Sequence, residues 1–194
     1  YEYFYPEGSV SMNRIKRCND ELKADRPTLK EVKFIPKFPI SILVENVRSV
    51  YNVGSIFRSA DGFGAKKIYL TGYTAHPPRE DLHKTALGAE DAVPWEYYEN
   101  PIKAAAVIKQ QGMPLVLVEQ THDSQSIYEM DFQFPICFMV GNEVLGVSEE
   151  LSKLADIHIE LPMHGIKQSL NVSVAVGVVG YEFARHYTQN KKLK

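Results

Sequence analysis

The sequence is poor in cysteine and has no long hydrophobic segment. Cys18 and Cys137 are its only cysteines. Because two are too few for a disulfide framework, we expect a reducing compartment, the cytoplasm. No run of eighteen or more apolar residues occurs, which predicts that the chain has no membrane-spanning helix. The first sixteen residues lack a basic segment followed by an apolar one, so we expect no signal peptide.

A strong net charge is also absent. The formal charge is −2 over 194 residues, of which 44% are hydrophobic and 24% charged, as in a soluble globular domain. The charge is nevertheless uneven. Residues 14–37 carry eight Lys/Arg and four Asp/Glu, whereas residues 38–190 carry eleven basic and eighteen acidic side chains. Basic ends on an acidic body are typical of a polyanion-binding rim, although a solvated helix face is the commoner cause of such a run.

Several catalytic signatures are missing as well. The six histidines show no metal-ligand spacing with one another or with the cysteines, so we expect no metal. GFG at 62–64 precedes a predicted strand instead of following one, and no nucleophile elbow occurs. GNEVLGVS at 141–148 resembles a P-loop, but Val147 replaces its lysine and Glu143 would repel a triphosphate. These absences exclude dinucleotide-binding, serine-hydrolase and nucleotide-hydrolase chemistry.

Apolar runs alternate with helical patterns from residue 41 onward. The runs are short and continuous, as expected of buried parallel strands. The alternation predicts the α/β class, with a mainly parallel sheet and helices on both faces. Gly64 is expected to end the first helix, and the Pro/Gly-rich segment 73–94 reads as a long connection. Strands are predicted at 41–47, 67–72, 95–98, 115–120, 136–141 and 157–161, and helices at 55–63, 101–112 and 148–155.

Residues 169–187, SLNVSVAVGVVGYEFARHY, are compatible with two structures. Alternating valines suggest a strand, but apolar residues spaced at i, i+4, i+7 and i+11 and the helix-forming end YEFAR favour a helix. A second stripe contains only small residues, and we expect it to pack closely against another backbone. This stripe consists of Ser173, Gly177, Gly180 and Ala184.

The N-terminal part differs in pattern from the rest. Residues 12–38 read as a helix followed by an extended linker, which is marked by Pro27, Pro36 and the adjoining Pro39. Met12 is a candidate native start, in which case residues 1–11 are an added segment or a tail. We therefore predict an N-terminal extension at 1–40, a main domain at 41–190 and a basic tail at 191–194.

Three polar segments follow predicted strands, where open α/β folds bind ligands. Asn52 and Arg58 lie at a strand-to-helix junction that favours an anion, unless Asn52 only caps the helix and Arg58 is a surface charge. Glu143 lies in a glycine-rich loop that suits a neutral or cationic ligand, or is an ordinary turn. Ser169 reads as a helix N-cap with Asn171 in the first turn, and both either bind a ligand or only cap.

Together, these segments resemble the SpoU (TrmH) family of RNA ribose 2′-O-methyltransferases, in the SPOUT superfamily. NVRSVYNVGSIFRSADGFG resembles the first family motif, FMVGNEVLGVSEEL the second and IELPMHGIKQSLNVSVAVGVVGYE the third. The likeness covers about residues 41–187, and three motifs in the right order are far more specific than any one of them.

The resemblance implies a fold that the pattern alone would not suggest. The C-terminal part is expected to thread through a loop as a deep trefoil knot, a feature nearly absent from other proteins. The knot loops are expected to bind S-adenosylmethionine, mainly through backbone groups, and the family members are homodimers whose active site takes residues from both subunits. The implied cofactor residues are Glu119, Thr121, Gly141, Leu161, Met163, Ser169 and Leu170.

The implied reaction transfers a methyl group to a ribose 2′-hydroxyl. Arg58 takes the place of the family's catalytic arginine. Because a guanidinium stays protonated in proteins, we expect it to bind phosphate and stabilise the developing alkoxide instead of acting as a base. The residues expected to orient Arg58 and the ribose are Asn52, Glu143, Ser169 and Asn171.

The implied substrate is RNA. The short N-terminal extension resembles the tRNA-modifying branch, and basic residues near the ends would contact phosphates. The alternatives are a ribosomal RNA methyltransferase and a non-catalytic RNA-binding module that kept the knot. The RNA-binding residues expected in the extension are Arg14, Lys16, Arg17, Lys23 and Arg26.

Overall fold

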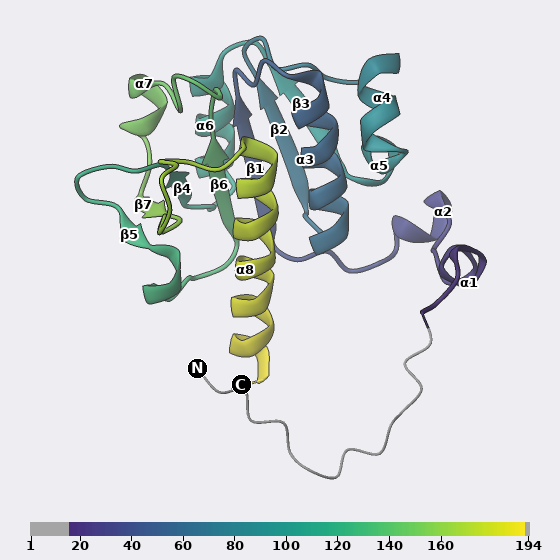
Figure 1. Cartoon of the computed structure of the whole chain (residues 1–194). Coiled ribbons are helices and arrows are strands. Elements are labelled where there is room, and N and C mark those ends of the chain that lie inside the picture. Colours follow the sequence, from purple (N-terminus) through teal and green to yellow (C-terminus); the bar gives the residue numbers. More distant parts are fainter. Residues whose placement is uncertain (1–15, 193–194) are drawn as a thin grey trace. The chain divides into compact units, whose positions relative to one another are not determined.

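A computed structural model describes residues 16–192 of the chain (Figure 1). The chain forms two compact units, one ending at Phe34 and one beginning at Ile35, so the observed boundary comes six residues before the predicted one at 40. Three of the predicted features lie outside the described residues: the segment 1–11, Arg14 and the last two residues of the basic tail.

The N-terminal unit contains two short helices, where a helix and an extended linker were predicted. Helix α1 spans Asn19–Ala24 and α2 spans Leu29–Val32. Thr28 begins α2, because its hydroxyl accepts the N–H of Glu31 at 3.3 Å and its own N–H donates to the Glu31 carboxylate at 2.7 Å. This capping box is the local signal that the sequence prediction missed.

A parallel sheet organises the second unit. Its seven strands lie in the order β3-β2-β1-β6-β4-β7-β5, and each strand runs parallel to its neighbours. The predicted α/β class with a mainly parallel sheet is therefore confirmed. The strands are β1 (Ile40–Glu45), β2 (Lys67–Thr71), β3 (Trp95–Tyr98), β4 (Leu115–Val118), β5 (Gln125–Ser126), β6 (Ile136–Val140) and β7 (Ile157–Glu160).

Helices cover both faces of this sheet, as predicted (Figure 1). Along β1, Ile42 and Val44 pack in the apolar cluster that contains α3 and α8, whereas Leu43 packs in the cluster that contains α6 and α7. This alternation is the period-two pattern of a strand buried on both sides. The helices of this unit are α3 (Val50–Phe63), α4 (Glu80–Ala86), α5 (Ala89–Ala92), α6 (Pro101–Gln110), α7 (Glu149–Ser152) and α8 (Val172–Lys192).

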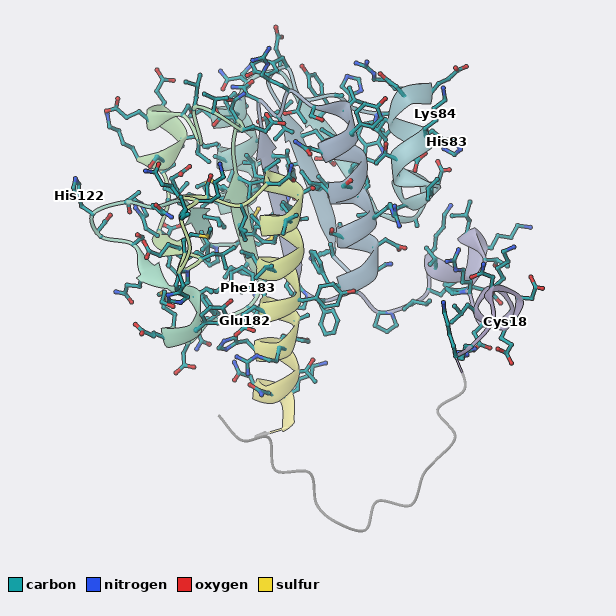
Figure 2. The ribbon with its side chains drawn as sticks, viewed as in Figure 1. Cys18, His83, Lys84, His122, Glu182 and Phe183 are labelled. Carbon is teal, nitrogen blue, oxygen red and sulfur yellow. The ribbon has the colours of Figure 1, made fainter. Side chains whose placement is uncertain are left out.

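The ambiguous C-terminal segment forms helix α8. Its apolar stripe is buried, and Phe183 (Figure 2) lies with its ring centroid 4.6 Å from that of Phe132. The predicted N-cap is wrong by two residues. Asn171, and not Ser169, caps the helix, because the Asn171 side-chain oxygen accepts the N–H of Ser173 at 2.9 Å. An amide oxygen at this position satisfies one of the unpaired N–H groups of the first turn.

The small stripe of α8 packs unevenly on α3. A Cβ added at Gly180 would overlap the ring of Phe63, whereas one at Gly177 would meet only the hydroxyl of Ser59, at 3.5 Å. Gly180 therefore allows the close approach of the two helices, and Gly177 has room to spare. Gly64 ends α3 with a φ of 73°, as predicted.

Two regions hold more structure than the sequence suggested. The connection 73–94 contains α4 and α5, and the short strand β5 is followed by a 3₁₀ turn, η1 (Ile127–Glu129). Leu87 ends α4 with a φ of 54°, a left-handed conformation that is uncommon outside glycine and that sequence periodicity does not reveal.

Candidate functional site

The three polar segments meet at one edge of the sheet. The first follows β1, the second follows β6 and the third follows β7. Strands β1 and β6 are hydrogen-bonded neighbours, and β7 is separated from β6 by β4 alone. Since all of these strands are parallel, their carboxyl ends lie at the same edge, where ligands bind in such folds.

Glu143 links the first two segments. One of its carboxylate oxygens accepts the N–H of Arg48 at 3.0 Å. The other accepts the N–H of Ser49 at 3.1 Å and the side-chain amide of Asn52 at 2.7 Å. Burial raises the pKa of Glu143, but these hydrogen bonds outweigh it and hold the pKa below its ordinary value. The carboxylate therefore stays ionised and holds the start of α3 in place.

Asn52 links the third segment to the first. Its side-chain oxygen accepts a hydrogen bond from the Asn171 amide at 3.1 Å while its amide donates to Glu143. We call Glu143, Asn52 and Asn171 the amide–carboxylate network. The alternative that Asn52 only caps the helix is wrong, because Ser49 is the N-cap and its hydroxyl accepts the Asn52 N–H at 3.2 Å.

Arg58 lies two turns along α3 from its start, and its side chain is exposed. Among the residues that the structure describes, no hydrogen bond or ion pair of Arg58 is found. The guanidinium is thus outside the network of its own chain and is free to meet an external anion. Ser169 is also exposed and lies on the wall of the neighbouring pocket.

A pocket of about 420 Å³ opens beside the network, within the range of roughly 300–1,000 Å³ typical of small-molecule sites. Segments after β4, β6 and β7 form its walls. Six of the seven predicted cofactor residues line it: Glu119, Gly141, Leu161, Met163, Ser169 and Leu170. Thr121 does not, since it bends into a turn where its hydroxyl donates to Asp123 at 2.8 Å.

The prediction omitted several other wall residues. Gly146 faces Glu119 so closely that a Cβ there would overlap the carboxylate, and its φ is 70°. Gly141 has no room for a Cβ against the backbone of Gly146 and Val147. Glycine spacing in the loop was the only sequence signal for this packing. The omitted lining residues include Gln120, Asn142, Val144, Gly146, Glu160 and Gln168.

The charge of the pocket wall is negative. Glu119, Glu143 and Glu160 line it, and its described lining contains no lysine, arginine or histidine. A phosphate-bearing cofactor would meet repulsion here, because nothing neutralises its charge. A ligand that carries positive charge is favoured.

Residues 16–192 were searched for a cluster that could bind a metal ion and for a helix that could span a membrane. In that part of the chain, no group of three or more His, Cys, Asp or Glu side chains is placed to hold a metal ion. Nor does any of its helices combine the length and apolarity needed to cross a bilayer.

The predicted RNA-binding residues belong to the N-terminal unit, apart from Arg14, which is not described. Lys16, Arg17, Lys23 and Arg26 are all exposed. Arg17 forms an ion pair with Asp25, and Lys23 lies 4.0 Å from Asp20. Two of the four cations are thus partly neutralised by their own unit.

Comparison with known proteins identifies the family. The sequence profile of the SpoU rRNA Methylase family matches residues 39–181, and this range includes the network and the pocket walls. The chain belongs to the SpoU family. The family predicted from the three motifs is thereby confirmed.

SpoU relatives extend the match to individual enzymes. The chain is 33% identical over 158 residues to a tRNA (guanosine(18)-2′-O)-methyltransferase of Aquifex aeolicus, covering 81% of this chain and 74% of the relative. The crystal structure of the A. aeolicus TrmH/SpoU tRNA modifying enzyme superposes with a TM-score of 0.75 at 29% identity, covering 84% of each chain. The SpoU methyltransferase AviRb of Streptomyces viridochromogenes in complex with AdoMet gives a TM-score of 0.69 at 26% identity, covering 84% of this chain and 65% of that one.

Proposed function

We propose that the chain is an S-adenosylmethionine-dependent RNA methyltransferase that modifies a ribose 2′-hydroxyl, with tRNA as its substrate. The observation that carries the proposal is the amide–carboxylate network beside a negatively charged pocket, in a chain of the SpoU family. The relatives named above act on tRNA or bind AdoMet according to their names.

The pocket fits the cofactor in size and charge. S-adenosylmethionine carries a sulfonium, an ammonium and one carboxylate. It is therefore net positive and has no phosphate, which suits a wall with three carboxylates and no cation. Leu161, Met163 and Leu170 supply apolar surface on the same wall. When bound, the cofactor supplies an electrophilic methyl group. The tight glycine contacts of the 141–146 loop hold the shape against which it would be oriented.

The nucleophile is a ribose hydroxyl, which reacts only when its proton leaves or its developing charge is stabilised. Arg58 suits the second role, because a guanidinium donates two parallel hydrogen bonds to phosphate or alkoxide oxygens. We assign the proton to phosphate or water. Asn52, Glu143 and Asn171 hold the surface on which the ribose is positioned, with Ser169 at its edge, and such positioning supplies much of the rate.

A homodimer completes the site in this proposal. Arg58 does not contact the network of its own chain, and it is available to the pocket of a second copy. The outer face of α8 offers an apolar surface for association: Val174, Val178 and Tyr181 recur at i, i+4 and i+7 and are 50%, 36% and 56% exposed. Exposed apolar rows on a helix are typical of interfaces.

The trefoil knot is a further part of the proposal. Strand β6 is inserted between β1 and β4, after which the chain passes beyond β4 to β7 and returns to pack α8 on α3. The returning segment is tied to the β4 end by the Gln120 amide, which donates to the Gln168 carbonyl at 2.6 Å.

A location in the cytoplasm, predicted from the cysteine content, stays a prediction.

The Arg58→Ala variant tests the assignment of the catalytic site. Isothermal titration with S-adenosylmethionine should give the same dissociation constant as wild type, because Arg58 is assigned to oxygens of the RNA and does not line the pocket of its own chain. Methyl transfer to RNA should fall by at least about a hundredfold, as when one preorganised donor to a developing oxyanion is removed. Substantial turnover in this variant would refute the role of Arg58. Failure of the wild type to bind the cofactor would instead favour the non-catalytic module.

A further inference from the structure

Tyr73 presents an aromatic ring to solvent beside the amide–carboxylate network. It lies two residues beyond the end of β2, at the same sheet edge as the network, and it is 59% exposed. Single exposed aromatic residues are common on protein surfaces. This ring differs from such residues in being held at several points.

Both ends of the residue are fixed by hydrogen bonds. The Tyr73 N–H donates to the side-chain oxygen of Asn46 at 3.1 Å, and its hydroxyl accepts the amide of Asn142 at 2.8 Å. Asn142 is itself only 7% exposed and also donates to the Asn46 carbonyl at 3.0 Å. The carboxyl ends of three adjacent strands, β2, β1 and β6, therefore hold one exposed ring.

The backbone adopts unusual conformations to place this ring. Asn46 has a φ of 54° and Gly72 a φ of 65°. Any Cβ at position 72 would overlap the Asn46 side-chain oxygen. Left-handed conformations at non-glycine residues are costly and cluster at functional sites. The local structure thus keeps Tyr73 in one orientation although its ring has little protein around it.

Asn142 connects this ring to the catalytic loop. Its side-chain oxygen accepts the N–H groups of Val144 and Leu145, each at 2.9 Å. The same side chain therefore shapes the turn that carries Glu143 and fixes the hydroxyl of Tyr73. A ribose held at the network would place its neighbouring nucleotides within reach of the ring.

A second aromatic group extends the surface. The Tyr97 hydroxyl donates to the Gly72 carbonyl at 2.7 Å, and Tyr97 is 39% exposed. The His76 ring lies with its centroid 4.4 Å from that of Tyr97. Tyr73, Tyr97 and His76 form what we call the aromatic shelf.

We propose that Tyr73 is the base-stacking residue of the site, and that its ring stacks on a base of the RNA substrate next to the methylated ribose. This inference rests on the proposed function. Aromatic side chains bind unpaired RNA bases by stacking, and they do so with little regard to base identity. A ring that is already immobilised loses little further freedom on binding. The aromatic shelf therefore raises the affinity for RNA and helps to position the stacked base. The choice of the methylated nucleotide depends on the shape of the RNA.

Tyr73→Leu and Tyr73→Phe separate stacking from a purely structural role. Leucine removes the flat ring, whereas phenylalanine keeps it and removes only the bond to Asn142. Tyr128→Leu is the matched control, because Tyr128 is 60% exposed and follows β5, at the opposite edge of the sheet from β3. The probe is an unmodified tRNA transcript with a fluorescent label, and anisotropy gives the dissociation constant at fixed salt.

We expect Tyr73→Leu to weaken RNA binding roughly 5- to 100-fold, the range of one lost base stack. Its S-adenosylmethionine binding and melting temperature should match those of Tyr73→Phe, because both variants lose the hydrogen bond to Asn142. Tyr73→Phe and Tyr128→Leu should bind within about twofold of wild type. Once the methylated nucleotide is mapped, removing one flanking base from the RNA should weaken binding by wild type but not by Tyr73→Leu, as in a double-mutant cycle.

Three results would overturn the inference and leave the proposed function standing. Tyr73→Leu that binds RNA as tightly as wild type shows that the ring does not stack. Equal losses in the leucine and phenylalanine variants show that only the hydroxyl matters. A changed molecular mass of Tyr73→Leu places the ring at a contact between copies of the chain. A wild-type protein that binds no RNA overturns the proposed function as well, so the two failures are distinguishable.

Discussion

At the scale of single residues, Asn52 is the link between segments that are distant in the sequence. The NH₂ group of its side chain donates a hydrogen bond to Glu143, and the side-chain oxygen accepts one from Asn171. An ionised carboxylate in its place could accept from Asn171 but has no hydrogen to donate to Glu143. The helix N-cap is left to Ser49, and the side chain of Asn52 is thereby available to the site.

Glu143 leads to a prediction about pH. Its pKa is lowered in the folded protein, so its ionised form stabilises the fold above the unfolded pKa of about 4.3. This contribution is lost as the pH falls through the lower, folded pKa. Glu143→Gln should therefore lower the melting temperature at pH 7 by about 2–4 °C, or about 1 kcal/mol for an exposed group.

The melting temperature of Glu143→Gln should approach that of wild type in acid. Thermal melts from pH 7 down to pH 3 measure the difference between wild type and Glu143→Gln, which should shrink below about pH 4.3. A difference that stays constant over this range would mean that the hydrogen bonds to Arg48, Ser49 and Asn52 do not depend on the charge.

At the scale of elements, the contact of α3 with α8 depends on Gly180 and not on Gly177, although the two glycines look equivalent in the sequence. Gly177→Ala should stabilise the protein by about 0.5–1 kcal/mol, since alanine is the better helix former and the new Cβ has room beside Ser59. Gly180→Ala should destabilise it, because Phe63 must move. Chemical denaturation of both variants measures the difference. The opposite order would show that the helices do not approach most closely at Gly180.

The sequence predicted the elements well where their pattern was strong. Every strand from β1 to β4, and β6 and β7, was expected, because a buried parallel strand is a continuous apolar run. The prediction failed where a few hydrogen bonds decide the structure. Thr28 begins α2, Asn171 caps α8, and the pieces of the 73–94 connection are too short for a periodic signal. Such features depend on local side-chain bonds and not on hydrophobic pattern.

At the scale of the whole molecule, the site depends on contacts between segments that no local pattern encodes. The three motifs predicted one site containing Arg58, Asn52, Glu143, Ser169 and Asn171. Hydrogen bonds join Asn52, Glu143 and Asn171, and the catalytic roles stay a prediction. The position of Thr121 and the role of Asn142 were not predictable, because both depend on how loops from different strands fold against one another. The exposed, immobilised ring of Tyr73 likewise emerges only from the ends of three adjacent strands.

The proposed dimer predicts a response to one surface charge. Wild-type protein should sediment at twice its chain mass of 22.0 kDa. Val178→Asp should sediment as a monomer and lose methyl transfer, because a carboxylate on the apolar face of α8 is unfavourable at an interface. Tyr128→Asp, which places the same charge at a residue near β5 that is 60% exposed, should remain a dimer. A dimeric Val178→Asp variant would remove α8 from the interface.

The basic residues of the N-terminal unit predict a salt dependence. Replacing Lys16 or Arg26 with alanine should weaken tRNA binding and lower the slope of log affinity against log salt by about 0.7–0.9 per lost phosphate contact. Arg17→Ala should have less effect, because Arg17 already pairs with Asp25. Unchanged slopes for all three variants would show that this unit does not contact the RNA backbone.

The central claim is methyl transfer to a ribose of RNA, and one measurement tests it most directly. The protein is incubated with unmodified tRNA and S-adenosylmethionine labelled in its methyl group, and the RNA is digested to nucleosides and separated. The account predicts label in a single 2′-O-methylated nucleoside. Label on a base, or no label in tRNA or ribosomal RNA with protein that binds the cofactor, would contradict it.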